Sequence, residues 1–367
     1  PLTVKCGIDP TGYDVHLGHL VPYKKMRQFQ DLGHKGVVII GDYTASIGDP
    51  TGKNESRPPL SHEQIQKNAE KYMDQVFTVL DKNKTEVRFQ SEWFSKVNLK
   101  DILSWAAQTT VAKLIGHDTF KNRLEQGHSL GLHEMFYPVL QGIDSVYIKA
   151  DVELGGSDQR FNVLMGRDYQ KWQGMRPQVA MLLPIITGTC GTQKMSKSLN
   201  NYIGILDEPK DMFGKIMSIP DNLMLEYYQY VLGVGPEEFE SIKKGLESQS
   251  LHPNEAKKQL ATRVVGFFHG QNIGAEMRQK FEDVFKKGAA PEDTPVIKIS
   301  KPVALIDLLV EAKMLESKGE GKRLFKQNAV SFLEGDKISE AEIMVDKKFH
   351  DKVIKIGKRK FLKILYE

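Results

Sequence analysis

Two short elements, far apart in the chain, combine residue types that act on phosphates. The first ends in His16-Leu-Gly-His19, where two histidines open a helical pattern after a glycine and proline turn. A helix N-terminus presents unpaired N–H groups and partial positive charge, so it favours a triphosphate, and imidazole donors stabilise charge that develops in a transition state. Gly18 lets a flat base approach the backbone closely. Alone, this element is weak evidence, because histidines at a helix start more often cap or pack.

The second element runs from Gly191 to Ser198 and places two lysines, Lys194 and Lys197, in a polar, glycine-flanked segment. Such a loop can close over phosphates whose negative charge grows as a pyrophosphate bond breaks. A chance match to the run Lys-Met-Ser-Lys-Ser is expected in roughly one in ten thousand chains, so this signal is strong. The alternative, a solvated basic loop, is disfavoured once both elements occur in this order.

Three polar side chains share one face of a third segment. Tyr137, Gln141 and Asp144 are spaced i, i+4 and i+7, so all three project from the same side of a helix. One interpretation is a polar face in water. The neighbouring run Pro-Val-Leu favours a packed helix whose polar face lines a site.

The pattern of elements that must position these residues is that of an α/β protein. Over the first two hundred residues, short apolar runs alternate with longer helical patterns, as in a parallel sheet with crossover helices. The run from Val37 to Ile40 is typical of a strand buried on both faces. We expect strands at 2–6, 36–41, 86–89, 145–149 and 179–184, and helices at about 19–32 and 62–80.

The remaining sequence adds further modules. A mainly helical stretch at about 100–135 interrupts the sheet pattern as an insertion. The predicted domains are a Rossmann-like catalytic domain at 1–198 with a mobile loop at 191–198, a helical domain at 199–288, a linker at 289–297 and a small α+β domain at 298–367. In the last domain, helices are expected at 303–312 and 319–327, and strands at 329–333, 352–356 and 360–365.

The composition argues against several classes of protein. With 40% hydrophobic and 27% charged residues among 367, the chain is typical of globular proteins, and no apolar run approaches the roughly 18 residues that span a bilayer. The two cysteines, Cys6 and Cys190, are too few for a disulfide framework and indicate a reducing cytoplasm. No Cys/His cluster predicts a protein-bound metal. The sequence begins without Met or a signal-peptide pattern, so we expect further residues before Pro1.

Positive charge is concentrated at the C-terminal end. Residues 298–367 hold 16 Lys and Arg against 11 Asp and Glu, a surplus of five positive charges, whereas the whole chain carries +4. This surplus indicates a module that contacts a polyanion, and a merely solvated charged surface is the alternative.

Together the two phosphate elements match the signatures of class I aminoacyl-tRNA synthetases, and essentially the whole chain resembles the bacterial-type tyrosyl-tRNA synthetases. The resemblance implies that L-tyrosine attacks the α-phosphate of ATP, with Mg²⁺, to give tyrosyl-adenylate and pyrophosphate, and that tRNA(Tyr) then takes the tyrosyl group. Neither step needs an enzyme nucleophile, so positioning and electrostatic stabilisation carry the catalysis. It also implies an anticodon-binding helical domain, a C-terminal S4-like RNA-binding domain and a homodimer with the insertion near its interface.

The resemblance assigns roles around ATP. His16 and Thr11 contact its terminal phosphate, and His19 lies with the turn at Cys6 against ribose and adenine. Asp158, in a Gly-Gly-Ser-Asp turn, accepts from the ribose 2′-hydroxyl. The implied ATP-binding residues are Cys6, Gly7, Asp9, Gly18, Gly156 and Asp158. The implied catalytic residues are His16, His19, Thr11, Lys53, Arg57, Lys194, Lys197 and Ser198, of which the lysines and the arginine act on pyrophosphate.

The same resemblance builds a tyrosine pocket. It places Tyr137, Gln141 and Asp49 around the substrate ammonium, Gln159 at the tyrosyl carbonyl and Asp144 at the phenol hydroxyl. A buried carboxylate that needs a hydroxyl partner discriminates strongly against phenylalanine, which leaves it unpaired.

Two residues of this pocket depart from the family pattern. Lys5 stands where the family has a tyrosine that shares the substrate hydroxyl, and Pro22 replaces a threonine near the ribose. We keep Lys5 in the tyrosine-binding set with two alternatives: it forms an ion pair with Asp144, or it faces outward from its strand.

The C-terminal segment resembles the S4 module, in which a helix pair and a small sheet offer a basic face. Phosphate contacts of this kind give salt-dependent affinity with little base information. The candidate residues are Lys322, Arg323, Lys326, Lys355, Lys358, Arg359 and Lys360.

Three alternatives compete with this interpretation. A class I synthetase for tryptophan is the nearest, but an indole has no hydroxyl for Asp144. An RNA-binding protein on a synthetase scaffold that has lost catalysis would not need the histidines and lysines of both elements. A nucleotidyltransferase with a His-x-Gly-His site would need neither the second lysine element nor an S4-like tail.

Overall fold

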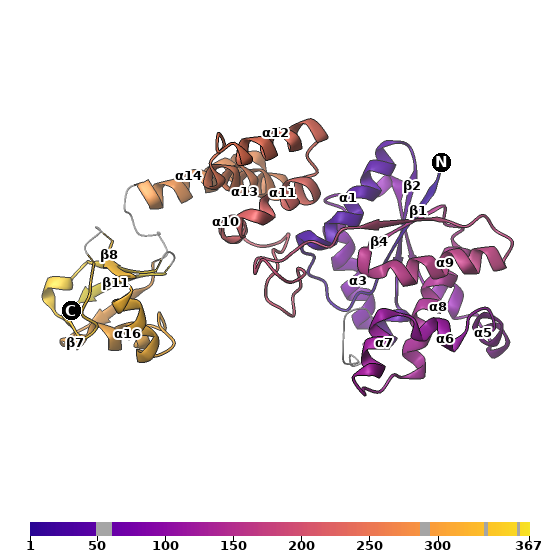
Figure 1. Cartoon of the computed structure of the whole chain (residues 1–367), viewed down its shortest axis with the longest axis horizontal. Helices are drawn as coiled ribbons and strands as arrows, with labels where there is room; N and C mark the ends of the chain where they lie inside the picture. The colour runs from indigo at the N-terminus through magenta and orange to yellow at the C-terminus, as the bar shows by residue number, and fades with distance from the viewer. Residues whose placement is uncertain (49–60, 287–293, 334–336, 358–359) are drawn as a thin grey trace. The chain divides into compact units, whose positions relative to one another are not determined.

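The computed structural model describes residues 1–48, 61–286, 294–333, 337–357 and 360–367 (Figure 1). The chain divides into two compact units, Pro1–Gly274 and Ala275–Glu367, and each is described by itself. The sheet and most of the helices that follow residue 198 belong to the first unit. The finer division into catalytic, helical and S4-like domains remains a prediction.

A five-stranded parallel sheet forms the centre of the first unit, in the order β3-β2-β1-β4-β5. The strands are β1 (Thr3–Ile8), β2 (Lys35–Ile40), β3 (Thr85–Phe89), β4 (Val152–Gly156) and β5 (Val179–Leu183). Residues 37–40 of β2 are at most 3% exposed, as expected for a strand covered on both faces. The predicted α/β class is confirmed.

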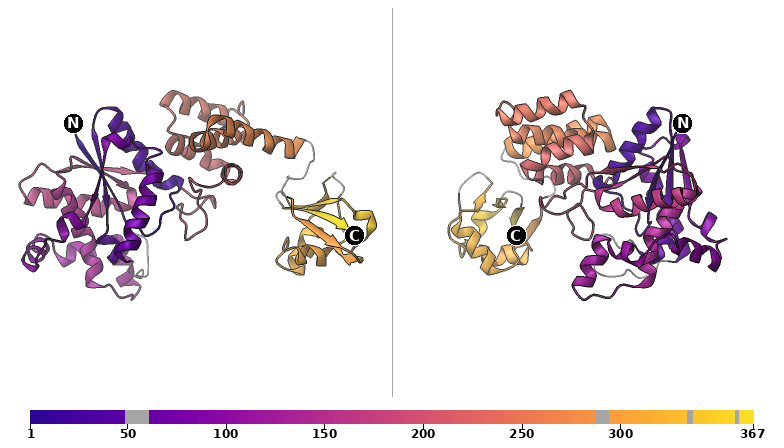
Figure 2. Two further views of the ribbon diagram at one scale, coloured as in Figure 1. Left: turned by 180° about the vertical axis from the view of Figure 1, so that it is seen from behind. Right: turned by 45° about the vertical axis from the view of Figure 1, so that its right-hand side comes forward.

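Helices cover both faces of this sheet (Figures 1 and 2). Because the strand order reverses between β1 and β4, right-handed crossovers place α1 (Leu17–Asp31) and α9 (Arg160–Trp172) on opposite faces. On the second face, α8 (Leu132–Tyr147) packs along α9. Gly142 permits this close approach, since a Cβ there would lie 2.9 Å from the ring of Tyr169.

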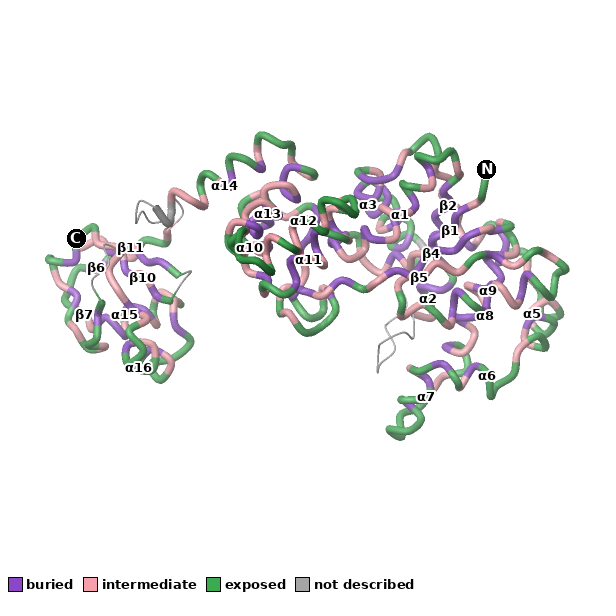
Figure 3. Tube along the Cα trace, turned by 45° about the horizontal axis from the view of Figure 1, so that its top comes forward, coloured by how far each residue is buried: buried purple, intermediate pink, exposed green. Residues whose placement is uncertain are grey.

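The other helices of the first unit lie around this core. The predicted insertion contains α5 (Leu99–Ala106), α6 (Val111–Ile115) and α7 (Asp118–Glu125), much of which is exposed (Figure 3). The remaining helices are α2 (Thr44–Ile47), α3 (His62–Val76), α4 (Ser91–Phe94), α10 (Pro209–Ser218), α11 (Met224–Glu226), the π-helix Tyr227–Leu232, α12 (Pro236–Glu247), α13 (Pro253–His269) and α14 (Gln271–Lys286), which continues into the second unit.

The strand predicted at 145–149 is wrong. Its first residues form the last turn of α8, and the fourth strand of the sheet begins only at Val152. The alternation of Val146 and Ile148 with polar residues imitates a strand. In the fold, both pack with Ile143 on the hydrophobic cluster against α9, so tertiary packing overrides the local β propensity.

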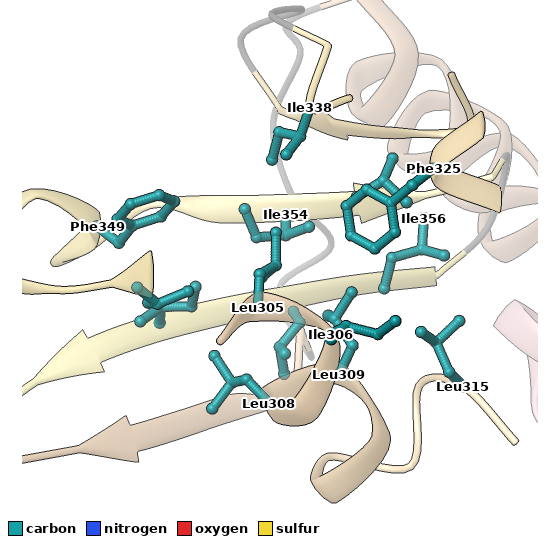
Figure 4. Close-up of a cluster of buried hydrophobic side chains, with 14 of the residues drawn as sticks. Leu305, Ile306, Leu308, Leu309, Leu315, Phe325, Ile338, Phe349, Ile354 and Ile356 are labelled. Atoms are coloured by element: carbon teal, nitrogen blue, oxygen red, sulfur yellow. The ribbon is translucent and has the colours of Figure 1, made fainter. Parts of the chain in front are cut away.

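The second unit is a small α+β body. Its sheet has the order β6-β11-β10-β8, and a short ladder joins β7 to β9. The elements are β6 (Val296–Ile299), β7 (Val303–Ala304), α15 (Leu305–Glu311), α16 (Lys318–Lys326), β8 (Val330–Phe332), β9 (Met344–Val345), β10 (Val353–Ile356) and β11 (Lys360–Tyr366). One apolar cluster, which includes Leu305, Phe325 and Ile354, fixes the helices on the sheet (Figure 4). β6 begins inside the predicted linker 289–297.

Candidate active site

A cavity of about 380 Å³ opens where the carboxyl ends of β1 and β4 meet. The strand order reverses at this place, and ligands of open α/β sheets bind there. Predicted site residues that line the cavity are Cys6, Gly7, Asp9, Thr11, His16, His19, Tyr137, Gln141, Asp144, Gly156, Gln159, Lys197 and Ser198. Residues from segments almost two hundred positions apart thus form one site.

The two histidines of the first element stack at the start of α1. Their ring centroids are 3.5 Å apart, and the His16 backbone N–H donates to His19 Nδ1 at 3.4 Å. Gly18 keeps this arrangement compact, because a Cβ there would lie 3.2 Å from the His16 ring. His16 Nδ1 is buried and has no hydrogen-bond partner among the described residues.

Both imidazoles are neutral at physiological pH. Burial, with a contribution from Lys197, lowers the pKa of His16 to about 4. Burial, followed by the charges of His16 and Lys197, holds the pKa of His19 well below its usual value. A neutral imidazole still carries one N–H donor, which it can offer to a phosphate oxygen.

The lysines of the second element reach carboxylates from two other segments. Lys194 Nζ lies 3.4 Å from Asp158 Oδ2, and Lys197 Nζ lies 3.6 Å from Asp14 Oδ2. Lys194 and Asp14 are exposed and Asp158 and Lys197 are half-buried, so solvent screens both ion pairs and they are weak. Asp14 was not predicted from the sequence.

Asn201 fixes the backbone of this lysine loop and was also not predicted. Its side chain is 3% exposed; Oδ1 accepts from Ser196 N at 2.8 Å, and Nδ2 donates to Lys194 O at 3.0 Å and to Cys190 Sγ at 3.2 Å. In the sequence Asn201 is one more polar residue after the motif. Only its burial and its hydrogen bonds in the fold show that it holds the backbone of the loop.

Asp144 forms a buried acceptor at the inner end of the cavity. Gln90 Nε2 donates to its Oδ2 at 2.8 Å and Trp93 Nε1 to its Oδ1 at 3.1 Å, and the residue is 2% exposed. Burial raises the pKa of Asp144 to about 7, against the opposing effects of Lys5 and the Gln90 donor. Gln90 directly follows β3, and polar residues after parallel strands are the signal that could have found it.

Asp9 connects residues predicted for ATP binding with residues predicted for tyrosine binding. Its Oδ2 accepts from the hydroxyl of Tyr137 at 2.9 Å, and its Oδ1 accepts from Thr44 Oγ1 at 2.7 Å. The residue predicted for ATP therefore contacts a residue predicted for tyrosine.

Both alternatives for Lys5 are wrong. Lys5 is 0% exposed, which excludes an outward-facing strand lysine, and its Nζ pairs with Glu153 Oε1 at 3.0 Å rather than with Asp144. The two residues are register partners on β1 and β4. Lys5 is also not among the described residues that line the cavity, and its place in the tyrosine-binding set stays a prediction.

Several predicted residues cannot be placed. Asp49, Lys53 and Arg57 lie outside the described residues, as do Lys358 and Arg359.

The other candidates for RNA contact lie in the second unit. Lys322, Arg323 and Lys326 are exposed on α16, Lys355 is half-buried on β10, and Lys360 is exposed at the start of β11.

The described residues contain no group of three or more His, Cys, Asp or Glu that could hold a metal ion. Among the described helices, none is both long and apolar enough to cross a membrane.

Two family models together match nearly the whole chain. Residues 1–286 match the family described as tRNA synthetases class I (W and Y), and residues 285–364 match the tyrosine–tRNA ligase SYY-like C-terminal domain. The chain is 46% identical to tyrosine–tRNA ligase of Desulfotalea psychrophila, over 100% of this chain and 90% of that protein. It is 47% identical to tyrosine–tRNA ligase of Idiomarina loihiensis, over 99% of this chain and 91% of that protein.

Solved structures share the fold at lower identity. A C-terminally truncated mitochondrial tyrosyl-tRNA synthetase of Aspergillus nidulans matches with a TM-score of 0.64 and 20% identity, over 77% of this chain and 86% of that one. Tyrosyl-tRNA synthetase of Archaeoglobus fulgidus, complexed with L-tyrosine, matches with a TM-score of 0.60 and 22% identity, over 76% and 90%.

The depressed pKa of His16 predicts a pH-dependent cost to stability. Between pH 6.5 and about 4 the unfolded chain binds a proton at this position and the folded chain does not, so folding is disfavoured as pH falls through this window. Relative to a His16→Gln variant, the wild type should lose up to about 3 kcal/mol of unfolding free energy over that range. Urea denaturation at a series of pH values measures the difference. Parallel pH profiles for the two proteins would contradict it.

Proposed function

The chain belongs to the family of tyrosine–tRNA ligases, class I synthetases that join tyrosine to tRNA(Tyr) with ATP, and we propose how its cavity performs this reaction. Tyrosine and ATP lie in the one cavity, with the tyrosine carboxylate facing the α-phosphate. The observation that carries the proposal is the buried carboxylate of Asp144 in the same cavity as the stacked histidines.

The tyrosine side chain ends at Asp144. This carboxylate accepts the phenol hydroxyl while Gln90 and Trp93 hold its two oxygens in place. Phenylalanine and the indole of tryptophan lack that hydroxyl, so either leaves a buried acceptor unpaired. At the other end of the substrate, Tyr137, Gln141 and Asp49 receive the ammonium and Gln159 the carbonyl.

ATP occupies the part of the cavity next to α1 and the lysine loop. Its adenosine lies along Cys6, Gly7, Asp9, Gly18 and Gly156, with the ribose at Asp158. Thr11 and the neutral imidazole of His16 donate to the terminal phosphate, and His19 lies against the adenosine. Lys194, Lys197 and Ser198, together with Lys53 and Arg57, take the pyrophosphate.

The chemistry then needs no covalent enzyme intermediate. A carboxylate oxygen of tyrosine attacks the α-phosphorus, the bond to the β-phosphate oxygen breaks, and pyrophosphate leaves. The donors and lysines stabilise the charge that accumulates on the pentacoordinate phosphate and on pyrophosphate. A ribose hydroxyl of the tRNA next attacks the tyrosyl carbonyl, and AMP leaves.

Mg²⁺ fits this site as a partner of ATP. This ion keeps several waters and binds through substrate phosphates more readily than through a cage of protein ligands. When bound, it neutralises phosphate charge.

A homodimer and a basic C-terminal module complete the proposal. The insertion exposes large apolar side chains, with Leu103 62% exposed, Val111 63% and Leu132 72%, which suits burial against a second copy. The basic residues of the 298–367 module that the sequence analysis names for RNA binding contact tRNA phosphates, and the helical segment 199–288 reaches the anticodon. We expect the protein to act in the cytoplasm, and the same family assignment supports this.

Replacement of His16 or Lys194 by alanine should lower adenylate formation by about 10²-fold or more, because each removes charge stabilisation used only in the transition state. Tyrosine binding should stay nearly intact. Tyrosine-dependent pyrophosphate exchange measures the rate of adenylate formation. The matched control is Lys171→Ala, which replaces an exposed lysine on α9. A normal rate would remove the substituted residue from the mechanism.

Asp144→Asn should remove the discrimination between tyrosine and phenylalanine. The amide offers one acceptor oxygen where Gln90 and Trp93 require two, so we expect kcat/KM for tyrosine to fall by about 10²-fold or more, with the KM for ATP little changed. Pyrophosphate exchange with tyrosine, phenylalanine and tryptophan gives the comparison. Exchange of the wild type with tryptophan but not tyrosine would end this interpretation.

Reversal of charge on α16 should weaken tRNA charging without affecting adenylate formation. Arg323→Glu with Lys326→Glu removes two phosphate contacts, so the KM for tRNA should rise and its dependence on salt should become shallower. Lys347→Glu, elsewhere in the same unit, is the matched control. Deletion of residues 294–367, which removes the whole small sheet, should likewise weaken tRNA charging and leave adenylate formation unchanged. Unimpaired tRNA charging would refute the role of this module.

A further inference from the structure

A buried ion pair lies behind the cavity wall and takes no part in the mechanism above. Lys5 Nζ and Glu153 Oε1 are 3.0 Å apart at the centre of the sheet, and the two side chains are 0% and 1% exposed. Removing two charges from water is expensive, and their attraction offsets that cost only when further hydrogen bonds satisfy both groups.

Those hydrogen bonds are present and they converge on helix α8. Lys5 Nζ also donates to the main-chain oxygen of Gln141 and to Ser145 Oγ, each at 2.8 Å, so its three N–H groups are all used. Glu153 accepts in addition from Gln141 Nε2 at 3.1 Å, from Ser145 Oγ at 3.0 Å and from Gln178 Nε2. The pair therefore holds both the main chain and the side chain of Gln141.

The chemistry of Glu153 decides which end of the Gln141 amide is free. A carboxylate only accepts hydrogen bonds, so the amide nitrogen must face Glu153 and the carbonyl oxygen is left for the cavity that Gln141 lines. A neutral amide at position 153 would accept either orientation. An ammonium only donates, so it requires the carbonyl end.

We propose that Lys5 and Glu153 are positioning residues that hold the Gln141 amide with its carbonyl oxygen toward the ammonium of tyrosine. Glu153 sets the orientation, and Lys5 neutralises Glu153 and anchors the helix at Gln141. This inference rests on the proposed function, in which Gln141 contacts the ammonium. It also gives a role to the lysine at position 5 that does not involve the phenol hydroxyl.

The test compares two ligands that differ only in the ammonium. In pyrophosphate exchange by the full chain, L-tyrosine is the substrate and 3-(4-hydroxyphenyl)propionate is the competitor, and an apparent dissociation constant is measured for each. The double variant Lys5→Met/Glu153→Gln removes both charges together, because either charge alone would be left buried and unpaired. We expect the apparent dissociation constant of tyrosine to rise about 10- to 100-fold, as for a lost hydrogen bond to a charged group. That of the propionate should change by less than about twofold. A merely structural role would weaken both ligands alike, and this result would overturn the proposal.

Two variants serve as control and as second measurement. Ser145→Ala removes two hydrogen bonds from the same cluster but leaves the contact between Glu153 and Gln141, so discrimination for the ammonium should persist. Glu153→Asp keeps a charge for Lys5 but shortens the reach to Gln141, and it should give the same selective loss, to a smaller extent, even if the double variant does not fold. Unchanged discrimination in Glu153→Asp would count against the proposal.

Gln141→Leu separates this inference from the function on which it rests. If this variant keeps full discrimination for the ammonium, Gln141 does not contact it and the proposed function fails at this residue. If Gln141→Leu loses the discrimination while the double variant keeps it, the proposed function stands and the positioning role of the ion pair is overturned.

Discussion

The rest of the structure depends on one constraint. Two neighbouring parallel strands, β1 and β4, are followed by helices that lie on opposite faces of the sheet. The reversal between β1 and β4 opens a crevice at their carboxyl ends. The histidine element follows β1, and Asp158 follows the glycines that end β4, so both lie at this edge of the sheet. The lysine loop also reaches this crevice, since Lys197 and Ser198 line the same cavity as the two histidines.

Low solvent exposure gives the cavity its electrostatic character. The histidines are held neutral by burial, and Asp144 is held between two donors at the inner end. In the lysine loop, Lys194 is exposed and Lys197 half-buried, and both pair only weakly with carboxylates. The site thus combines a buried part with a more solvated part that carries the lysine charges. In the proposed function, the first part selects the amino acid and the second binds phosphate.

The fold and the core of the site could be predicted because they depend on local patterns. Buried parallel strands appear as short apolar runs, and the face of Tyr137, Gln141 and Asp144 follows from helical spacing alone. The predicted strand at 145–149 failed where local pattern and tertiary packing disagree, since the end of α8 and the start of a strand have the same alternation of apolar residues.

By itself the sequence determined the α/β class and the class of chemistry, because these depend on residue type and on spacing along the chain. The roles of individual site residues and the finer domain division stay predictions. Only the tertiary structure decided the partners. Glu153 rather than Asp144 faces Lys5, Gln90 and Trp93 hold Asp144, and Asn201 anchors the lysine loop. Hydrogen bonds and ion pairs act over about 3 Å in space, and residues that close can be far apart in sequence, so no local pattern specifies them.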